Sequence, residues 1–234
     1  MKAVYLLVGV CLLLTSLNPA QGPGKPGVPS PLNLSENIWF FGFIPKDAWV
    51  SHHYILTNPH RDTVTITKMV PSCDCTHVPP TPISIPPGES RPIKVLFATE
   101  TYFGEINREV EVYTDQRPDS HFTLYFGSAV AVDPRTLRVT PRSIVFIAGK
   151  EKETIKVENL IDEETRVRIR LDHDSSLAVS QNEAMLQSRQ SFSFDIRPIW
   201  DKLPFGPNYS CLTLEFIRKS DVVWITVPVK TNRF

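Results

Sequence analysis

The stretch WVSHHYILTN, residues 49–58, decides the fold class because its residues alternate between two faces. In an extended chain one face carries Val50, His52, Tyr54 and Leu56. A period of two indicates a strand with one buried face, whereas an amphipathic helix repeats every 3.6 residues. This stretch therefore predicts a β-strand with a mainly apolar inner face.

The same alternation recurs along the chain, between polar breakers such as NPHRD, PPGES and LPFGPN. Only EAMLQSRQ, residues 183–190, offers a weak helical turn. Many short strands rich in Val, Ile, Thr and aromatic residues predict an all-β antiparallel sandwich. The segments are TVTITKMV, PIKVLFAT, INREVEVYT, HFTLYFGSAV, ETIKVEN, RVRIRL, SFSFDIRP, CLTLEFIRK and VVWITVPV.

An internal repeat divides the chain. SENIWF, VSHHYILTN and TVTITK in the first half recur in order as PRSIVF, TIKVEN and TRVRIRL in the second. The spacing of about 100 residues is the size of one immunoglobulin-like module. We therefore expect two tandem immunoglobulin-like antiparallel β-sandwiches, residues 34–132 and 133–234, with Asn58 and Asn159 ending equivalent strands and opening the next turns.

The N-terminus resembles a secretory signal peptide over residues 1–20, because Met1-Lys2 precede a short apolar run and a small-residue exit. That run is about half the length needed to cross a membrane. Residues 21–33, rich in Gly and Pro, are expected to form a tether. The sequence thus predicts an exported protein that is periplasmic, envelope-associated or secreted, with no transmembrane span after cleavage near Ala20.

Charge and motifs exclude several classes. Lys plus Arg (25) balance Asp plus Glu (25), so no net field favours nucleic acid or an anionic membrane. None of the six histidines lies in a catalytic motif, so we expect no enzyme, no catalytic residues and no cofactor-binding residues. His52 is expected to be a hydrogen-bonded core residue. LDHDSS, residues 171–176, is expected to be a hydrophilic turn rather than a calcium loop.

Three arginines, Arg166, Arg168 and Arg170, alternate with apolar residues in one predicted strand. We interpret them as a solvated or edge face that discourages pairing with another sheet.

The stretch VPSCDCTHVP, residues 70–79, holds the chain's most distinctive chemistry. Cys73 and Cys75 are candidates for a local disulfide, which requires a turn at Asp74 because residues two apart in a strand stand about 6.6 Å apart. Together with His77 they are also candidate ligands for copper or zinc, although a fourth ligand is missing. Reactive-thiol chemistry is a third possibility. Cys211 is expected to be a lone core or half-buried thiol.

Several segments resemble a family of exported bacterial proteins catalogued as domain of unknown function 1573. The resemblance covers residues 40–115, and its most specific element is PSC-x-CT; the other segments are FGFIPKDAWVSHHYILTN, ISIPPGES, IKVLFAT and INREVEVYTD. It implies an immunoglobulin-like fold and export, but no agreed activity. Asp74 stands where the family usually has glycine.

Two functions follow as hypotheses. The preferred one is an exported, non-enzymatic interaction or structural module of the cell envelope that binds a protein partner through sandwich edges or loops. The alternative is a metal-binding or thiol-redox protein that uses the CDCTH stretch, with copper or zinc as its cofactor.

Overall fold

The computed structural model describes residues 30–116, 120–147, 149–173 and 176–234. The predicted signal peptide and most of the predicted tether lie outside these residues. Leu32, at the end of the predicted tether, is buried in the first core. The packed chain therefore begins slightly earlier than the sequence indicated.

Eighteen strands and one short 3-10 turn form the described secondary structure, which confirms the all-β fold class. The first module, residues 32–130, contains β1 (Asn33–Leu34), β2 (Ile38–Ile44), β3 (Trp49–Thr57), β4 (Val64–Pro71), β5 (Thr76–His77), β6 (Ile83–Ile85), β7 (Ser90–Ala98), β8 (Gly104–Thr114) and β9 (His121–Val130). The second module, residues 137–234, contains β10 (Leu137–Thr140), β11 (Ile144–Ile147), β12 (Glu153–Asn159), β13 (Thr165–Leu171), β14 (Leu177–Val179), β15 (Glu183–Leu186), β16 (Ser191–Pro198), η1 (Trp200–Lys202), β17 (Gly206–Ile217) and β18 (Val222–Arg233).

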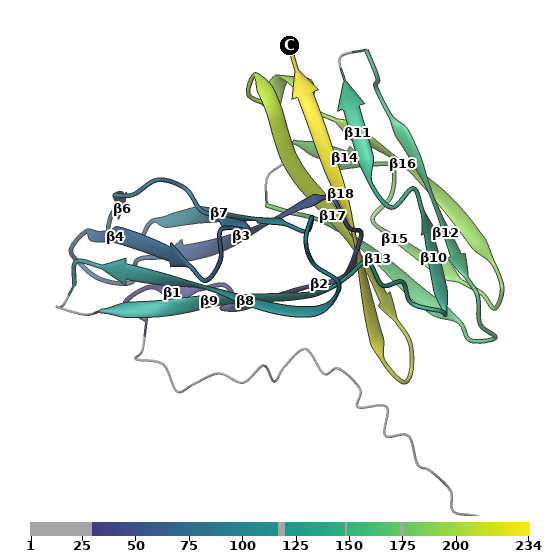
Figure 1. Cartoon of the computed structure of the whole chain (residues 1–234), viewed down its shortest axis with the longest axis horizontal. Coiled ribbons are helices and arrows are strands. Elements are labelled where there is room, and N and C mark those ends of the chain that lie inside the picture. The colour runs from purple at the N-terminus through teal and green to yellow at the C-terminus, as the bar shows by residue number, and fades with distance from the viewer. Residues whose placement is uncertain (1–29, 117–119, 148, 174–175) are drawn as a thin grey trace, which may run out of the picture.

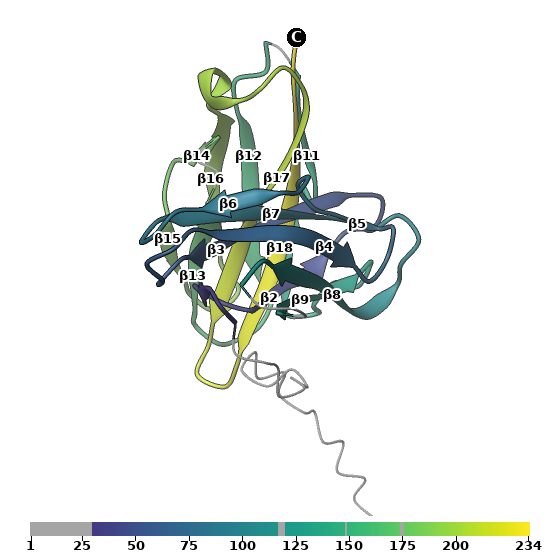
Figure 2. The same cartoon turned by 90° about the vertical axis from the view of Figure 1, so that its left-hand side faces the viewer.

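The two modules have the same strand order. One sheet runs β1-β3-β7-β5 in the first module and β10-β12-β16-β14 in the second. The facing sheets run β2-β9-β8-β4-β6 and β11-β18-β17-β13-β15, and β18 also pairs with β2 to join them. The strands of one module run across those of the other, and β17 and β18 lie at the junction (Figures 1 and 2).

Each module has its own hydrophobic core between its two sheets. The inward faces of the alternating strands supply both cores, as the period of two requires. The largest fully buried side chains include Tyr54, Phe41 and Phe97 in the first core and Phe146 and Phe216 in the second.

Gly42 lies between two phenylalanines, Phe41 and Phe43, that pack in different cores. Its φ is +69°, and a Cβ there would lie 2.0 Å from the backbone oxygen of Trp224 in β18, so only glycine fits. The register of β2 against β9 shifts at this point. Phe41 is consequently buried in the first core, while Phe43 packs against the second.

Asn58 and Asn159 make matching hydrogen bonds at the ends of β3 and β12. The Asn58 side chain donates to the carbonyls of Asp62 and Ile85, and the Asn159 side chain donates to those of Glu163 and Gln187. Both asparagines are buried. Each also accepts a bond from the backbone N–H two residues later, as a turn-opening asparagine should.

One local expectation was wrong, and a second was only half right: the arginines of β13 do lie on an exposed or half-buried face, but the strand is not at an edge. The weak helical stretch begins as β15, which pairs with β13, so tertiary pairing overrides the helix preference of its residues. The arginine strand is not an edge, because β13 lies between β15 and β17. Arg168 and Arg170 instead contact Glu215 across the sheet.

Candidate functional site

The turn between β4 and β5 carries a disulfide between Cys73 and Cys75, with Cα atoms 5.2 Å apart. The chain turns at Asp74, where the backbone N–H of Thr76 donates to the Cys73 carbonyl over 3.2 Å. The Cys75 carbonyl accepts a bond from Ala98 of β7. The turn is thus fixed to the sheet immediately after the second cysteine.

His77 follows this turn in β5 and is exposed. Its ring contacts that of Trp49, and Trp49 stacks on Tyr209 of the second module. Within the described residues, no group of three or more His, Cys, Asp or Glu side chains is arranged to hold a metal ion. Disulfide sulfurs are not thiolates, so the copper or zinc hypothesis requires the reduced pair and stays a prediction.

Cys211 is a free, buried thiol that lies in the second module's β17 but packs in the first module's core. Its Sγ donates to the backbone carbonyl of Ser51 over 3.0 Å. Burial and the negative charge of Asp172 raise the pKa of the Cys211 thiol to about 12. This thiol therefore stays protonated and unreactive near neutral pH.

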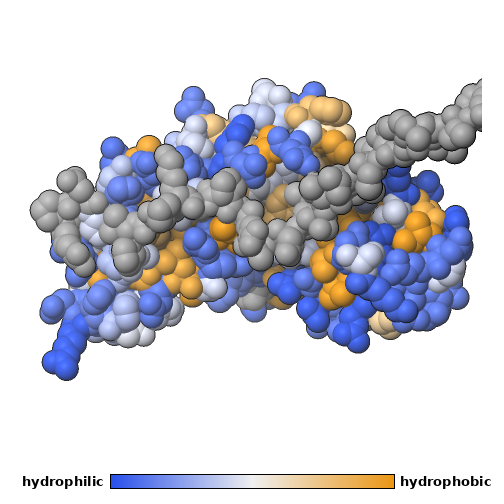
Figure 3. Space-filling view, turned by 90° about the horizontal axis from the view of Figure 1, so that it is seen from below, coloured by the Kyte–Doolittle hydropathy of each residue, from blue (hydrophilic) through white to orange (hydrophobic). Residues whose placement is uncertain are grey.

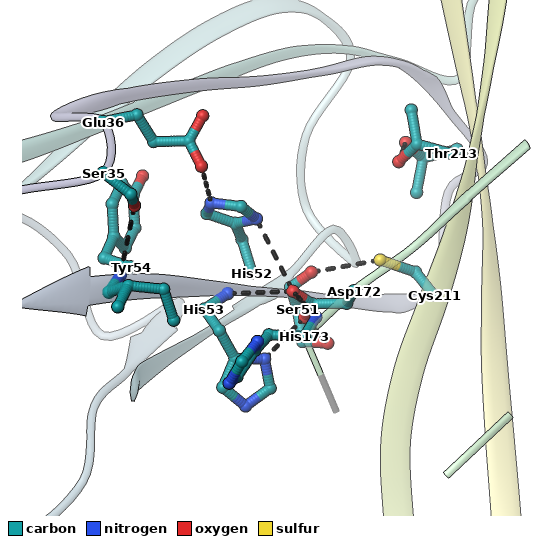
Figure 4. Close-up of polar contacts among 12 residues, drawn as sticks. Ser35, Glu36, Ser51, His52, His53, Tyr54, Asp172, His173, Cys211 and Thr213 are labelled. Carbon is teal, nitrogen blue, oxygen red and sulfur yellow. Dashed lines mark hydrogen bonds and ion pairs between the residues drawn. The ribbon is translucent and has the colours of Figure 1, made fainter. Parts of the chain in front are cut away.

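A polar cluster that the sequence did not reveal lies between the modules. Asp172, just after β13, reaches β3 of the first module (Figure 4). Its Oδ2 lies 2.8 Å from Nδ1 of His53, and its Oδ1 accepts the backbone N–H of His53 over 3.1 Å. The Ser51 hydroxyl also donates to the Asp172 carboxylate. Nδ1 of His52 lies 3.7 Å from Oδ1 of Asp172.

His52 connects this cluster to the start of the first module. Its Nε2 lies 2.9 Å from Oε1 of Glu36, and its ring stacks on Trp39 at 4.0 Å. It is buried and hydrogen-bonded on the core face of β3, where the sequence analysis expected it. A cavity of about 270 Å³ lies beside the cluster and is lined in part by Glu36, Arg170 and His173.

Asp172 is held as a carboxylate despite its burial. Its side chain is 5% exposed. Burial acts to raise the pKa of Asp172, but the hydrogen bond and charge of His53 and the charge of His52 outweigh it, so the pKa lies below its ordinary value. Burial and the nearby Glu36 and Asp172 carboxylates raise the pKa of the Tyr54 hydroxyl. The arrangement anchors one module to the other, since the carboxylate oxygens are bonded to fixed groups of both.

LDHDSS was expected to be only a hydrophilic turn, and its first aspartate is instead this anchor. No local signal distinguishes it, because its partners in β3 lie 119 positions away.

Residues 32–130 match the family model described as "Protein of unknown function (DUF1573)". The first module is similar to this family over its whole length. The match spans all nine strands of this module and includes the disulfide turn, which confirms the resemblance seen over residues 40–115. The second module lies outside the matched residues. A search of curated proteins finds no sequence match.

The solved structures that are similar to this chain share little sequence with it. The periplasmic chaperone SfaE is 9% identical over 42% of this chain, with a TM-score of 0.39, and the aligned part spans 57% of the chaperone. WR4, a C. elegans MSP family member, is 12% identical over 41% of this chain and 97% of its own length, with a TM-score of 0.36. A protein of unknown function from Porphyromonas gingivalis W83 is 11% identical over 87% of this chain and its whole length, with a TM-score of 0.37.

No helix among the described residues is long and apolar enough to cross a membrane. The molecular face seen in Figure 3 mixes hydrophilic areas with small hydrophobic ones over both modules.

Proposed function

We propose that this protein is an exported, non-enzymatic interaction module of the cell envelope that binds a protein partner along the outer edge of β11. The observation that carries the proposal is a difference between equivalent strands. β2 pairs with β9 on one side and with β18 on the other, whereas β11 pairs only with β18 among the described strands. The position that β18 occupies beside β2 is thus open beside β11.

The four residues of β11 include none of the charged side chains that usually protect an edge strand. Its outward residues, Val145 and Ile147, are 52% and 55% exposed. The edge strand β10 has the same alternating burial, but its outward residues are Arg138 and Thr140. Charged and polar side chains discourage pairing with foreign strands, while exposed β-branched apolar residues favour it.

The occupant that fits this edge is an extended segment of another protein with apolar residues at alternate positions. Two carbonyls of β11 are hydrogen-bonded to Lys150. Its backbone N–H donates to the Ile147 carbonyl over 3.0 Å, and its Nζ donates to the Val145 carbonyl over a longer distance of 3.5 Å. The long Val145 contact is easily exchanged for a main-chain bond. Because β11 has four residues, side-chain contacts with Val145 and Ile147 must supply much of the affinity.

Site-specific photo-crosslinking tests this proposal. A photoreactive residue at position 145 should give a discrete adduct with one protein when the chain is expressed in a bacterial envelope, and one at position 138 of β10 should not. Ile147→Lys should abolish the adduct, whereas the matched change Thr140→Lys on β10 should leave it. Equal adducts from both positions, or an adduct that survives Ile147→Lys in a folded protein, would contradict the proposal.

A further inference from the structure

The disulfide turn carries a second inference, which does not depend on the proposed binding edge. Main-chain bonds already hold both ends of the turn: Ser72 N–H donates to the Glu109 carbonyl and Ala98 N–H donates to the Cys75 carbonyl, each over 2.9 Å. A disulfide between residues only two apart restrains little additional chain in the unfolded state. The bond therefore contributes little to holding the fold, and a chemical role is the better account of it.

The two sulfurs differ in their surroundings. Both cysteines are half-buried, but Cys75 packs against the hydrophobic core and Cys73 is outside that contact group. Attack from outside is therefore easier at Cys73, with Cys75 as the leaving sulfur. Accessible disulfides with a stabilised leaving thiolate exchange fastest.

A buried hydroxyl is positioned to assist the exchange. Oγ1 of Thr76 lies 3.3 Å from the sulfur of Cys73 and 3.9 Å from that of Cys75. It can donate a hydrogen bond to the Cys73 thiolate when that sulfur is released in the last step of an exchange, whereas the Cys75 thiolate, which leaves first, lies farther from it. Asp74, exposed between the cysteines, acts in the opposite direction because a carboxylate disfavours a neighbouring thiolate.

We propose that the Cys73–Cys75 disulfide is a stoichiometric thiol–disulfide exchange site that oxidises one dithiol of another protein, a reaction without turnover that a non-enzymatic module can carry out. A substrate thiolate attacks the Cys73 sulfur, the bond between the cysteines breaks, and Cys75 leaves with the electron pair and takes up a proton. The second substrate thiolate then attacks the substrate sulfur of the mixed disulfide and releases Cys73 as a thiol. The substrate gains one disulfide and loses two electrons and two protons, which reduce Cys73 and Cys75.

The test uses the full oxidised chain and a reduced synthetic peptide that contains two cysteines. We expect one peptide disulfide to form for each Cys73–Cys75 bond lost, at least about tenfold faster than with oxidised glutathione. Alkylation and mass spectrometry should then find two new thiols in the peptide that spans residues 73–75. Exchange no faster than with glutathione, or only after unfolding in urea, would overturn the proposal.

Three variants make the test specific. Thr76→Val keeps the side-chain shape and should slow exchange about tenfold, while Asp74→Asn should accelerate it about threefold. Cys211→Ala is the control and should leave the rate unchanged, because that thiol is buried elsewhere. Circular dichroism verifies that each variant is folded. An unchanged rate in folded Thr76→Val, or a loss of exchange in folded Cys211→Ala, would also refute the assignment.

Discussion

The two modules have the same strand order and the same asparagine turns. The turns that follow the equivalent strands β4 and β13, however, carry different functional groups. In the first module this turn carries the disulfide, and in the second it carries Asp172, which contacts the other module. The strands on either side are fixed by pairing and burial, whereas the turns between them are not. Chemistry can therefore vary at these turns without a change of fold.

The outer edges of β2 and β11 differ in the same way. β18 covers the first, with the Thr226 hydroxyl donating to the Phe41 carbonyl over 2.6 Å, and no described strand covers the second. The outer edge of β2 thus forms the contact between the modules, whereas the outer edge of β11 is not paired with any described strand.

The largest expected effect comes from breaking the asparagine turns. Asn58→Ala removes the buried donor to the carbonyls of Asp62 and Ile85, of which the Ile85 bond is buried, and should lower the free energy of unfolding by about 3 kcal/mol. Asn159→Ala should cost about 2 kcal/mol, because its bond to Gln187 is longer at 3.2 Å. Urea unfolding followed by circular dichroism measures both.

The sheet shared by the two modules predicts that they unfold together. Because β18 pairs in both modules, each substitution should shift one common transition. Two separate transitions, with only one moved by each substitution, would show that the modules unfold independently.

A smaller effect, and one that depends on pH, is expected at the contact between the modules. Asp172→Asn keeps the side-chain size but removes the charge that faces His53 and His52, and should cost about 2 kcal/mol at neutral pH. The pKa of Asp172 is lowered in the folded protein, so its charge stabilises the fold above the ordinary carboxyl pKa of about 4. That stabilisation is lost as the pH falls through the lowered pKa.

Urea titrations from about pH 6 to pH 2 test this sign. The wild-type protein should lose more stability over this range than Asp172→Asn, so the two curves should converge at low pH. Parallel curves would show that Asp172 does not stabilise the folded protein as a carboxylate.

The smallest effect is expected at Cys211. Cys211→Ala removes a thiol and its bond to the Ser51 carbonyl, and should cost about 1 kcal/mol. A thiol reagent at pH 8 should not label Cys211 in the folded wild-type protein, because its pKa is about 12, and should label it in urea. Rapid labelling without denaturant would contradict the buried position.

Local patterns predicted the strands and the disulfide turn because both depend on residues close together in the chain. Val50, Tyr54 and Leu56 show the inner face of β3 by alternation alone, and Cys73 and Cys75 stand two apart. β15 was missed because Glu, Ala, Met and Leu favour helix, and only the partner strand β13 decides otherwise.

The contact between the modules could not be predicted in this way. Asp172 joins the two modules because its carboxylate lies beside His53 of β3. Phe43 packs against the second core because Gly42 has no side chain and the backbone of Trp224 can approach it closely. These pairs are far apart in sequence, and no single stretch contains both members. The sequence indicated a polar turn and an aromatic strand, and the three-dimensional packing assigned each its partner.

The pairing of β18 with β2 can form only late in synthesis, because β18 is the last described strand to be made. Thr226 and its partner Phe41 are separated by 185 positions, so at about 5–20 residues per second the early strand emerges about 10–40 s before the late one. During that interval the nascent first module lacks both the strand beside β2 and the Cys211 side chain in its core. The first module can therefore complete this edge and this part of its core only after most of the second module has been synthesised.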